Sequence, residues 1–275
     1  MKLEKKYRWL VITLLVLLAV EFAVFLALLE RRLHPAISEA ISELLPTQAA
    51  EVTPEPTPEP TPSPTPVPTP EPTPALRKRT DLLVLVNPWH EMEEGYVPEL
   101  RQVTWGYEEE QFMDVRAADA LMQMMADCAD AGNSPFICSS YREPEKQEYL
   151  FNNKIYRLVY EEGVDPSAAP EIAARSVAVP GTSEHQLGLA ADIIDYDFPY
   201  LNREQEERPT QKWLMEHCWD YGFILRYPPD RSEITGIIYE PWHYRYVGIE
   251  AAQEIRDLGL TLEEYLEQYY EPIEN

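Results

Sequence analysis

The sequence has 275 residues and a formal net charge of −25, with 48 acidic and 23 basic side chains. Its first 80 residues carry nine charges of each sign, so the whole excess of negative charge lies in residues 81–275. Nucleic acids and anionic membrane surfaces attract basic proteins, and this charge therefore argues against both as partners of residues 81–275.

The first element in chain order is an apolar segment at residues 9–29, in which Glu21 is the one charged residue. Its 21 residues are about the length that a helix needs to cross roughly 30 Å of hydrocarbon. Basic residues within 1–8 favour a cytoplasmic N-terminus, although Arg31 and Arg32 weaken that asymmetry. No small-residue cleavage site follows the segment, so we expect an uncleaved transmembrane signal anchor rather than a removed signal peptide.

A proline-rich segment comes next. From Pro54 to Pro74 every second residue is proline, which prevents a helix or a sheet ladder because proline lacks the backbone N–H. Such a tract forms a stiff polyproline II spacer of about 3.1 Å per residue. We therefore expect residues 30–80 to be an extracellular stalk, which places residues 81–275 outside the cell on a single-pass membrane anchor.

Residues 81–275 have the length of one domain with a substantial core. Apolar runs predict strands, whereas 3.6-residue periodicity with capping residues predicts helices. The expected strands are 82–86, 135–139, 189–194, 223–227 and 237–246, the last broken at Pro241. The expected helices are 114–132, 145–162, one from Asp165, 210–222, and two short closing ones, the last opened by a capping box at Thr261. This mixed order predicts an α+β domain with a small antiparallel sheet flanked by helices.

The cysteines do not form a candidate metal site, because none of the three has C-x-x-C spacing. A candidate lies instead at residues 183–192, which read S-x-H-x-x-G-x-A-x-D. The backbone freedom of Gly188 lets His185 and Asp192 converge on one point. This pair alone is equally compatible with a buried histidine that is satisfied by a neighbouring carboxylate.

A second motif changes that balance. Residues 240–243 read E-x-W-H, and they add His243 as a further ligand and Glu240 as a carboxylate close to it. Two imidazoles and one carboxylate, with room for water and a base that is not a ligand, are what a catalytic zinc requires. Trp242 adds an apolar wall, and we therefore expect a Zn²⁺ ion in a cleft of this domain.

The chain resembles the VanY-type zinc D,D-carboxypeptidases, with the related L,D-carboxypeptidases and D-alanyl-D-alanine dipeptidases. Besides the two motifs, the resemblance rests on the segments S-S-Y-R at 139–142, F-I-L-R-Y-P at 223–228 and Y-E-P-W-H-Y-R-Y-V-G at 239–248. It implies that zinc is held by three ligands, with a glutamate as general base. The ligands would be His185, Asp192 and His243, and the base Glu240.

The resemblance also implies how the substrate is held. The arginine of the S-x-Y-R turn and the serine that opens the first zinc motif bind a terminal carboxylate in that family, and these are Arg142 and Ser183 here. The fork of donors on a guanidinium matches the two oxygens of a carboxylate. Gln147 is at a position that lines the pocket in the family, and Trp242 completes the substrate-binding residues.

We therefore expect a zinc metallopeptidase that removes the C-terminal D-alanine from peptidoglycan stem peptides. An L,D-carboxypeptidase or a wall endopeptidase would use the same zinc site with a different pocket. A non-catalytic module with structural zinc, binding the wall or a protein, is the alternative from another class. Glu240 favours catalysis, because a structural zinc does not require a base beside it.

Overall fold

The computed structural model describes residues 76–105 and 110–272. The predicted signal anchor and all of the predicted stalk before residue 76 lie outside these ranges. None of the helices within the described part combines the length and the hydropathy that crossing a bilayer requires.

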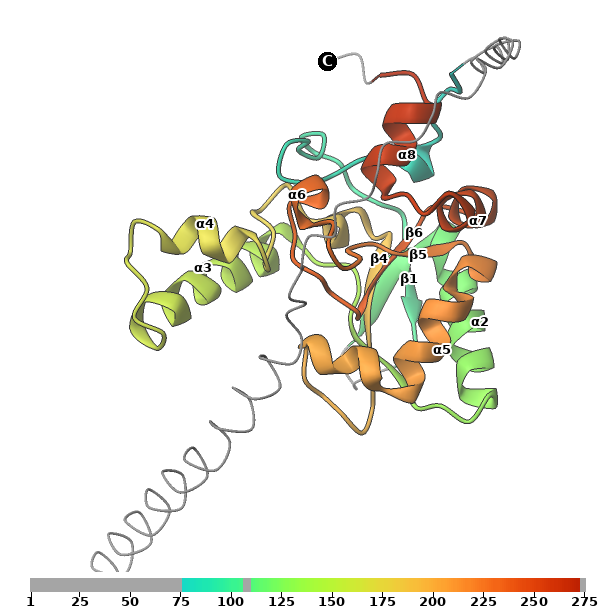
Figure 1. Ribbon diagram of the computed structural model, residues 1–275, viewed down its shortest axis with the longest axis horizontal. Helices are drawn as coiled ribbons and strands as arrows, with labels where there is room; N and C mark the ends of the chain where they lie inside the picture. Colours follow the sequence, from blue (N-terminus) through green and yellow to red (C-terminus); the bar gives the residue numbers. More distant parts are fainter. Residues whose placement is uncertain (1–75, 106–109, 273–275) are drawn as a thin grey trace, which may run out of the picture. The chain divides into compact units, whose positions relative to one another are not determined.

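Two antiparallel sheets are present in the described residues (Figure 1). The larger has the strand order β3-β4-β6-β5, formed by Pro135–Ser139, Ala190–Asp195, His243–Tyr246 and Phe223–Leu225. The smaller pairs β1, Leu100–Val103, with β2, Gln111–Asp114. The prediction of an α+β fold with small antiparallel sheets is confirmed, although the β1–β2 pair was not expected.

Seven α-helices are described: α2 Val115–Asp130, α3 Pro144–Tyr160, α4 Ala169–Ala174, α5 Pro209–His217, α6 Ser232–Thr235, α7 Ile249–Leu258 and α8 Leu262–Tyr269. Their starts follow local chemistry. Asp114 caps α2 by accepting a hydrogen bond from the amide of Arg116, and Thr261 forms the expected capping box with Glu264 at α8. Prolines occupy the first turns of α3 and α5, where a missing N–H costs nothing.

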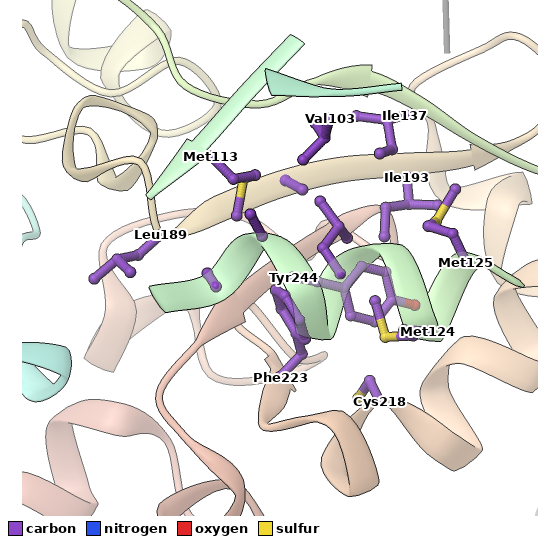
Figure 2. Packing of buried hydrophobic residues seen from close by; sticks show 14 of the residues in the cluster. Val103, Met113, Met124, Met125, Ile137, Leu189, Ile193, Cys218, Phe223 and Tyr244 are labelled. Atoms are coloured by element: carbon purple, nitrogen blue, oxygen red, sulfur yellow. The ribbon is translucent and has the colours of Figure 1, made fainter. Parts of the chain in front are cut away.

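The main core lies between the larger sheet and α2 (Figure 2). Ile137, Ile193 and Tyr244 from three neighbouring strands pack with Met124 and Met125 of α2. All six residues of β4 are buried, because this central strand is covered on both faces. The strand that carries Asp192 is therefore among the most firmly held elements of the domain.

Helices α3 and α4 have a small core of their own. Leu158 of α3 packs with Ala169 and Ala173 of α4, separately from the main cluster. Figure 1 shows the pair set apart from α2, α5 and α7. This arrangement makes α3 a wall that projects beside the sheet rather than a layer of the main core.

Several expected boundaries are wrong. The strand expected at 82–86 is replaced by a 3-10 turn, Asp81–Leu83, and an extended segment. Its carbonyls do not join a ladder, because those of Leu82 and Val84 each accept a hydrogen bond from the Arg245 guanidinium, at 2.9 Å.

Two further differences have local causes. The helix expected from Asp165 begins at Ala169, because the Asp165 carboxylate accepts from the amide and hydroxyl of Ser167 and forms a turn there. The strand expected at 237–246 does break at Pro241 as predicted, but only the part after the break forms a strand, β6. Before it, the amide of His243 donates to the carbonyl of Glu240 in a turn across Pro241.

Candidate metal site and substrate cleft

Two adjacent strands and one tight turn bring the expected metal ligands together. His185 lies in the 3-10 turn Glu184–Leu187, which ends at Gly188 with φ of 70°. A Cβ on Gly188 would approach the amide nitrogen of Asp114 to 3.1 Å, so glycine suits this turn for its space as well as its backbone. Asp192 on β4 pairs directly with His243 on β6, which places both side chains on one face of the sheet.

The three side chains converge on one point. His185 Nε2 lies 3.2 Å from Asp192 Oδ2, and His243 Nδ1 lies 3.1 Å from Asp192 Oδ1. The imidazole centroids are 4.9 Å apart and the rings are nearly perpendicular. One ligand atom from each residue lies within 4.8 Å of the others, and all three residues are buried. Two nitrogens and one oxygen in this arrangement fit a zinc ion with an open coordination position.

The far side of each imidazole determines which nitrogen is free for a metal. His185 Nδ1 lies 2.7 Å from the carbonyl of Ser140, which can only accept, so Nε2 keeps its lone pair. His243 Nε2 lies 3.4 Å from Glu184 Oε2, so once this ring has lost a proton its Nδ1 can offer a lone pair to a metal. Such outer partners hold metal-binding histidines in the correct tautomer and orientation.

Glu184 belongs to a buried cluster of charges that the sequence analysis missed. Its Oε1 accepts from Arg226 Nε at 2.7 Å and from Arg245 Nη1 at 2.8 Å. Arg226 also forms a two-bond pair with Glu263 on α8, at 2.6 and 2.9 Å. Glu184 and both arginines have fully buried side chains. A signal existed in the sequence, because arginines within otherwise apolar strands need a buried carboxylate partner.

The electrostatics of the two histidines differ. Burial lowers the pKa of His185, and Arg142 lowers it further. Burial also acts to lower the pKa of His243, but hydrogen bonds with Asp192 and Glu184 outweigh it and raise this pKa to about 9. Asp192 stays ionised, because both histidines overcome the effect of burial and lower its pKa.

Glu240 lies beside the ligands without joining them. Its Oε2 is 3.8 Å from His243 Nδ1, and its side chain is 9% exposed. Burial, helped by Asp192 and opposed by His243 and Arg142, raises the pKa of Glu240 to about 8. A carboxylate that is raised toward neutrality is suited to taking and returning a proton near physiological pH.

Arg142 is fixed rather than free. Its guanidinium donates to Gln147 Oε1 at 2.7 Å and to Ser139 Oγ at 2.8 Å, and its backbone amide donates to the carbonyl of His185 at 3.1 Å. Gln147 in turn donates to the carbonyl of Ala178 at 2.6 Å. Gln147 is fully buried and does not line the pocket as expected, so it acts on a substrate only by holding Arg142 in place.

A cleft of about 470 Å³ opens over these groups. The expected residues Arg142, Ser183 and Trp242 line it, together with Glu240 and the three ligands. Its metal-binding end therefore offers a guanidinium, a hydroxyl, a carboxylate and an indole around one point. This set suits a small substrate that carries its own carboxylate.

Comparisons with known proteins agree with this arrangement. The family model described as "VanY: D-alanyl-D-alanine carboxypeptidase" matches residues 110–249. A D-alanyl-D-alanine carboxypeptidase of Enterococcus faecalis is 42% identical over 184 residues, which are 67% of this chain and 65% of that protein. YodJ of Bacillus subtilis is 35% identical over 201 residues, which are 70% of each chain.

Solved structures give the same picture. The D,D-pentapeptidase VanY from a VanB-type resistance cassette, in complex with Zn(II), has a TM-score of 0.60 and 41% identity and covers 67% of this chain and 98% of its own. VanYB in complex with D-alanine-D-alanine has a TM-score of 0.61 and 41% identity, covering 68% and 97%. The LdcB LD-carboxypeptidase has a TM-score of 0.60 and 35% identity, covering 68% and 86%.

Proposed function

This chain belongs to the VanY family of D-alanyl-D-alanine carboxypeptidases, and we propose that it is a zinc D,D-carboxypeptidase that removes the C-terminal D-alanine from peptidoglycan stem peptides. The observation that carries the proposal is the convergence of His185, Asp192 and His243 beside the buried carboxylate of Glu240. The relatives described as D-alanyl-D-alanine carboxypeptidases and the VanYB complex with D-alanine-D-alanine support it.

The roles of the residues follow from their positions. Zinc, when held by His185, Asp192 and His243, supplies a Lewis acid for the scissile carbonyl and lowers the pKa of a water molecule. Glu240 accepts the proton of the attacking water and returns it to the nitrogen of the departing D-alanine.

The free C-terminus of the substrate is recognised by Arg142 and Ser183. Because Gln147 and Ser139 already hold the Arg142 guanidinium, little side-chain entropy is lost when a carboxylate binds. In an endopeptidase substrate the residue after the scissile bond is followed by another peptide bond, and it has no free carboxylate for Arg142 and Ser183 to bind. The pocket therefore favours a carboxypeptidase over an endopeptidase.

An L,D-carboxypeptidase acting on tetrapeptides is the second candidate, favoured by the likeness to LdcB. It would use the same zinc ligands and the same base. A non-catalytic module with structural zinc is less well supported, since it has no use for a buried glutamate 3.8 Å from a ligand.

We also propose that the catalytic domain lies outside the cell on a single-pass anchor. The 21-residue apolar segment at 9–29 and the proline-rich residues up to 80 support this location. The test is fractionation of cells that express the full chain, followed by protease treatment of intact protoplasts. Recovery of the chain in the soluble fraction, or protection of the domain from protease, would contradict the proposal.

The activity is tested on the full chain in detergent, with a pentapeptide ending in D-Ala-D-Ala and a tetrapeptide ending in one D-alanine. We expect D-alanine from the pentapeptide, loss of release with a chelator, and recovery with zinc. Glu240→Gln should lower kcat by about 10²- to 10⁴-fold and keep bound zinc, while exposed Glu250→Gln serves as the matched control. Release that ignores the chelator, or full activity of Glu240→Gln, would refute the proposal.

A further inference from the structure

The cleft does not end at the metal site but continues along α3. Four residues of this helix line it: Leu150, Asn153, Lys154 and Arg157. Their spacing of three, four and seven residues defines one face of a helix. This face of α3 is therefore a wall of the cleft, and it lies outside the residues that the proposed reaction uses.

The charge of this wall is unlike that of the rest of the domain. Residues 81–275 contain 39 acidic and 14 basic side chains, so an average stretch of their surface is acidic. Apart from Asp192 and Glu240 at the metal site, no carboxylate belongs to the described lining of the cleft, whereas Lys154 and Arg157 both do. The other described lining beyond the metal site is mostly apolar and includes Leu201, Ile237 and Ile238.

The two cations have only weak partners within the described chain. Lys154 Nζ lies 3.8 Å from Glu162, at the outer limit of an ion pair. Arg157 Nε lies 3.2 Å from Glu161, but both side chains of that pair are more than half exposed. Exposed pairs of this kind contribute little in water. A carboxylate that enters the cleft can therefore compete for both cations.

The position along the helix indicates which part of a substrate reaches them. Gln147, which holds Arg142, lies in the first turn of the same helix, and Lys154 and Arg157 follow after seven and ten residues. At 1.5 Å per residue these steps correspond to about 10 and 15 Å. An extended peptide advances roughly 3.4 Å per residue. A substrate whose C-terminus is held by Arg142 would therefore reach this wall with its backbone about three to four residues before its end, or one residue nearer the end through a long side chain.

We propose that Lys154 and Arg157 form a subsite for a carboxylate that the substrate carries upstream of the scissile bond. The inference rests on the proposed function and names its preferred substrate class. Stem peptides carry such a group in two places. One is the side chain of a diaminopimelate third residue, and the other is the free α-carboxylate of a γ-linked D-glutamate at the second residue.

Four pentapeptides separate these sources. They combine meso-diaminopimelate or L-lysine at the third residue with D-isoglutamate or D-isoglutamine at the second. With the full chain and zinc, we expect kcat/KM to be about tenfold higher for the peptide with the recognised carboxylate, mainly through a lower KM. The peptide position at which replacing the carboxylate by a neutral group removes the higher kcat/KM identifies the source of the recognised carboxylate.

The double variant Lys154→Gln/Arg157→Gln should lose the preference, with kcat/KM for the carboxylate peptide falling to that for the neutral peptide. Lys146→Gln is the matched control, because Lys146 lies on α3 over the ring of Tyr149 and outside the described lining. Bound zinc and the unfolding temperature, measured for each variant, verify that the fold is intact. Rates within twofold for all four peptides, or a preference that the double variant retains, would overturn the subsite.

Binding to the zinc-loaded Glu240→Gln variant keeps this inference separate from the proposed reaction. Calorimetry on the same four peptides measures the carboxylate preference without turnover. If the wild-type chain releases no D-alanine but the Glu240→Gln variant still binds the carboxylate peptides preferentially, the proposed function is refuted and the subsite is supported. Equal binding of all four peptides would refute the subsite, whatever the rate of turnover.

Discussion

The two histidines of the metal site are held in different ways. His185 donates from Nδ1 to a main-chain carbonyl, that of Ser140, at 2.7 Å. His243 contacts the Glu184 carboxylate through Nε2 at 3.4 Å, and that carboxylate is itself held by two buried arginines. The first ligand depends on one local turn, whereas the second depends on charges from distant parts of the chain.

The difference indicates where the site is vulnerable. No substitution removes a backbone carbonyl, so the support of His185 survives most changes of side chain. The support of His243 extends through Arg226 to Glu263 on α8, and through Arg245 to the carbonyls of Leu82 and Val84. The last helix and the first described segment of the domain thus meet behind one metal ligand.

The largest effect is expected from Glu184→Ala, which leaves Arg226 and Arg245 buried without their shared carboxylate. Removing one partner of a buried ion pair costs about 3–5 kcal/mol. The measurement is urea unfolding of the full chain without metal. Ser140→Ala is the counterpart on the other side, since it removes hydroxyl contacts with Phe112 and Gln111 but keeps the carbonyl. It should cost less, about 1–3 kcal/mol.

Equal destabilisation by Glu184→Ala and Ser140→Ala would contradict the contrast between the two supports. So would a loss below about 1 kcal/mol for Glu184→Ala, because a buried network of this kind cannot be removed at so small a cost.

Zinc affinity gives the next largest effect. Glu184→Gln keeps the shape of the side chain but removes its charge, and the loss of an outer partner typically weakens metal binding by about 10–100-fold. Competition with a chromophoric chelator at pH 9 or above measures this change without reference to activity, at a pH where the His243 proton competes little with the metal. Ser140→Ala should bind zinc within about twofold of the wild type, because the acceptor for His185 is unchanged. A similar loss in both variants would show that the effect is general destabilisation.

Much of this site could be predicted from the sequence, and the parts that could not share one cause. His185, Asp192, Glu240 and His243 carry their chemistry in short motifs, and the structure brings all four together. The residues that hydrogen-bond to the far side of these ligands are brought there by the tertiary fold, and the sequence spacing of the motifs does not predict them. Glu184 lies inside the first motif, and the arginines predict a buried carboxylate partner, but only the fold shows that Arg226, just after β5, and Arg245 of β6 share Glu184.

The fold shows the same division. Helices α2 and α8 were predicted, because their capping residues and apolar faces act locally. Residues 82–86 have the apolar pattern of a strand but do not form one, because the carbonyls of Leu82 and Val84 bind Arg245, which lies more than 160 residues away in the sequence. The short β1–β2 pair was missed, since its strands have only four residues each and mixed exposure.

A third experiment uses pH to distinguish the two histidines. The pKa of His243 is raised to about 9 by Asp192 and Glu184 against the effect of burial, and that of His185 is lowered by burial. A metal must displace the His243 proton below pH 9 but none from His185 at neutral pH. The apparent zinc affinity should therefore rise about tenfold per pH unit from pH 7 and flatten near pH 9.

The Glu184→Gln variant sharpens this test. Removing the Glu184 charge lowers the pKa of His243, so the flattening should occur at a lower pH than in the wild type. The measurement is the same chelator competition in metal-buffered solutions. A zinc affinity that does not change between pH 7 and 9 would contradict the difference between the two histidines.

The smallest effect is expected at the surface end of the network. Thr261 caps α8 by accepting from the amide of Glu264, and the next residue but one, Glu263, holds Arg226. Thr261→Ala should cost about 1 kcal/mol in urea unfolding, whereas Thr261→Ser keeps the cap and should cost less. Zinc affinity should change less than about twofold, because Arg226 remains bonded to Glu184 when the first turn of α8 loosens. A tenfold loss of zinc affinity in Thr261→Ala but not in Thr261→Ser would show that α8 acts directly on His243.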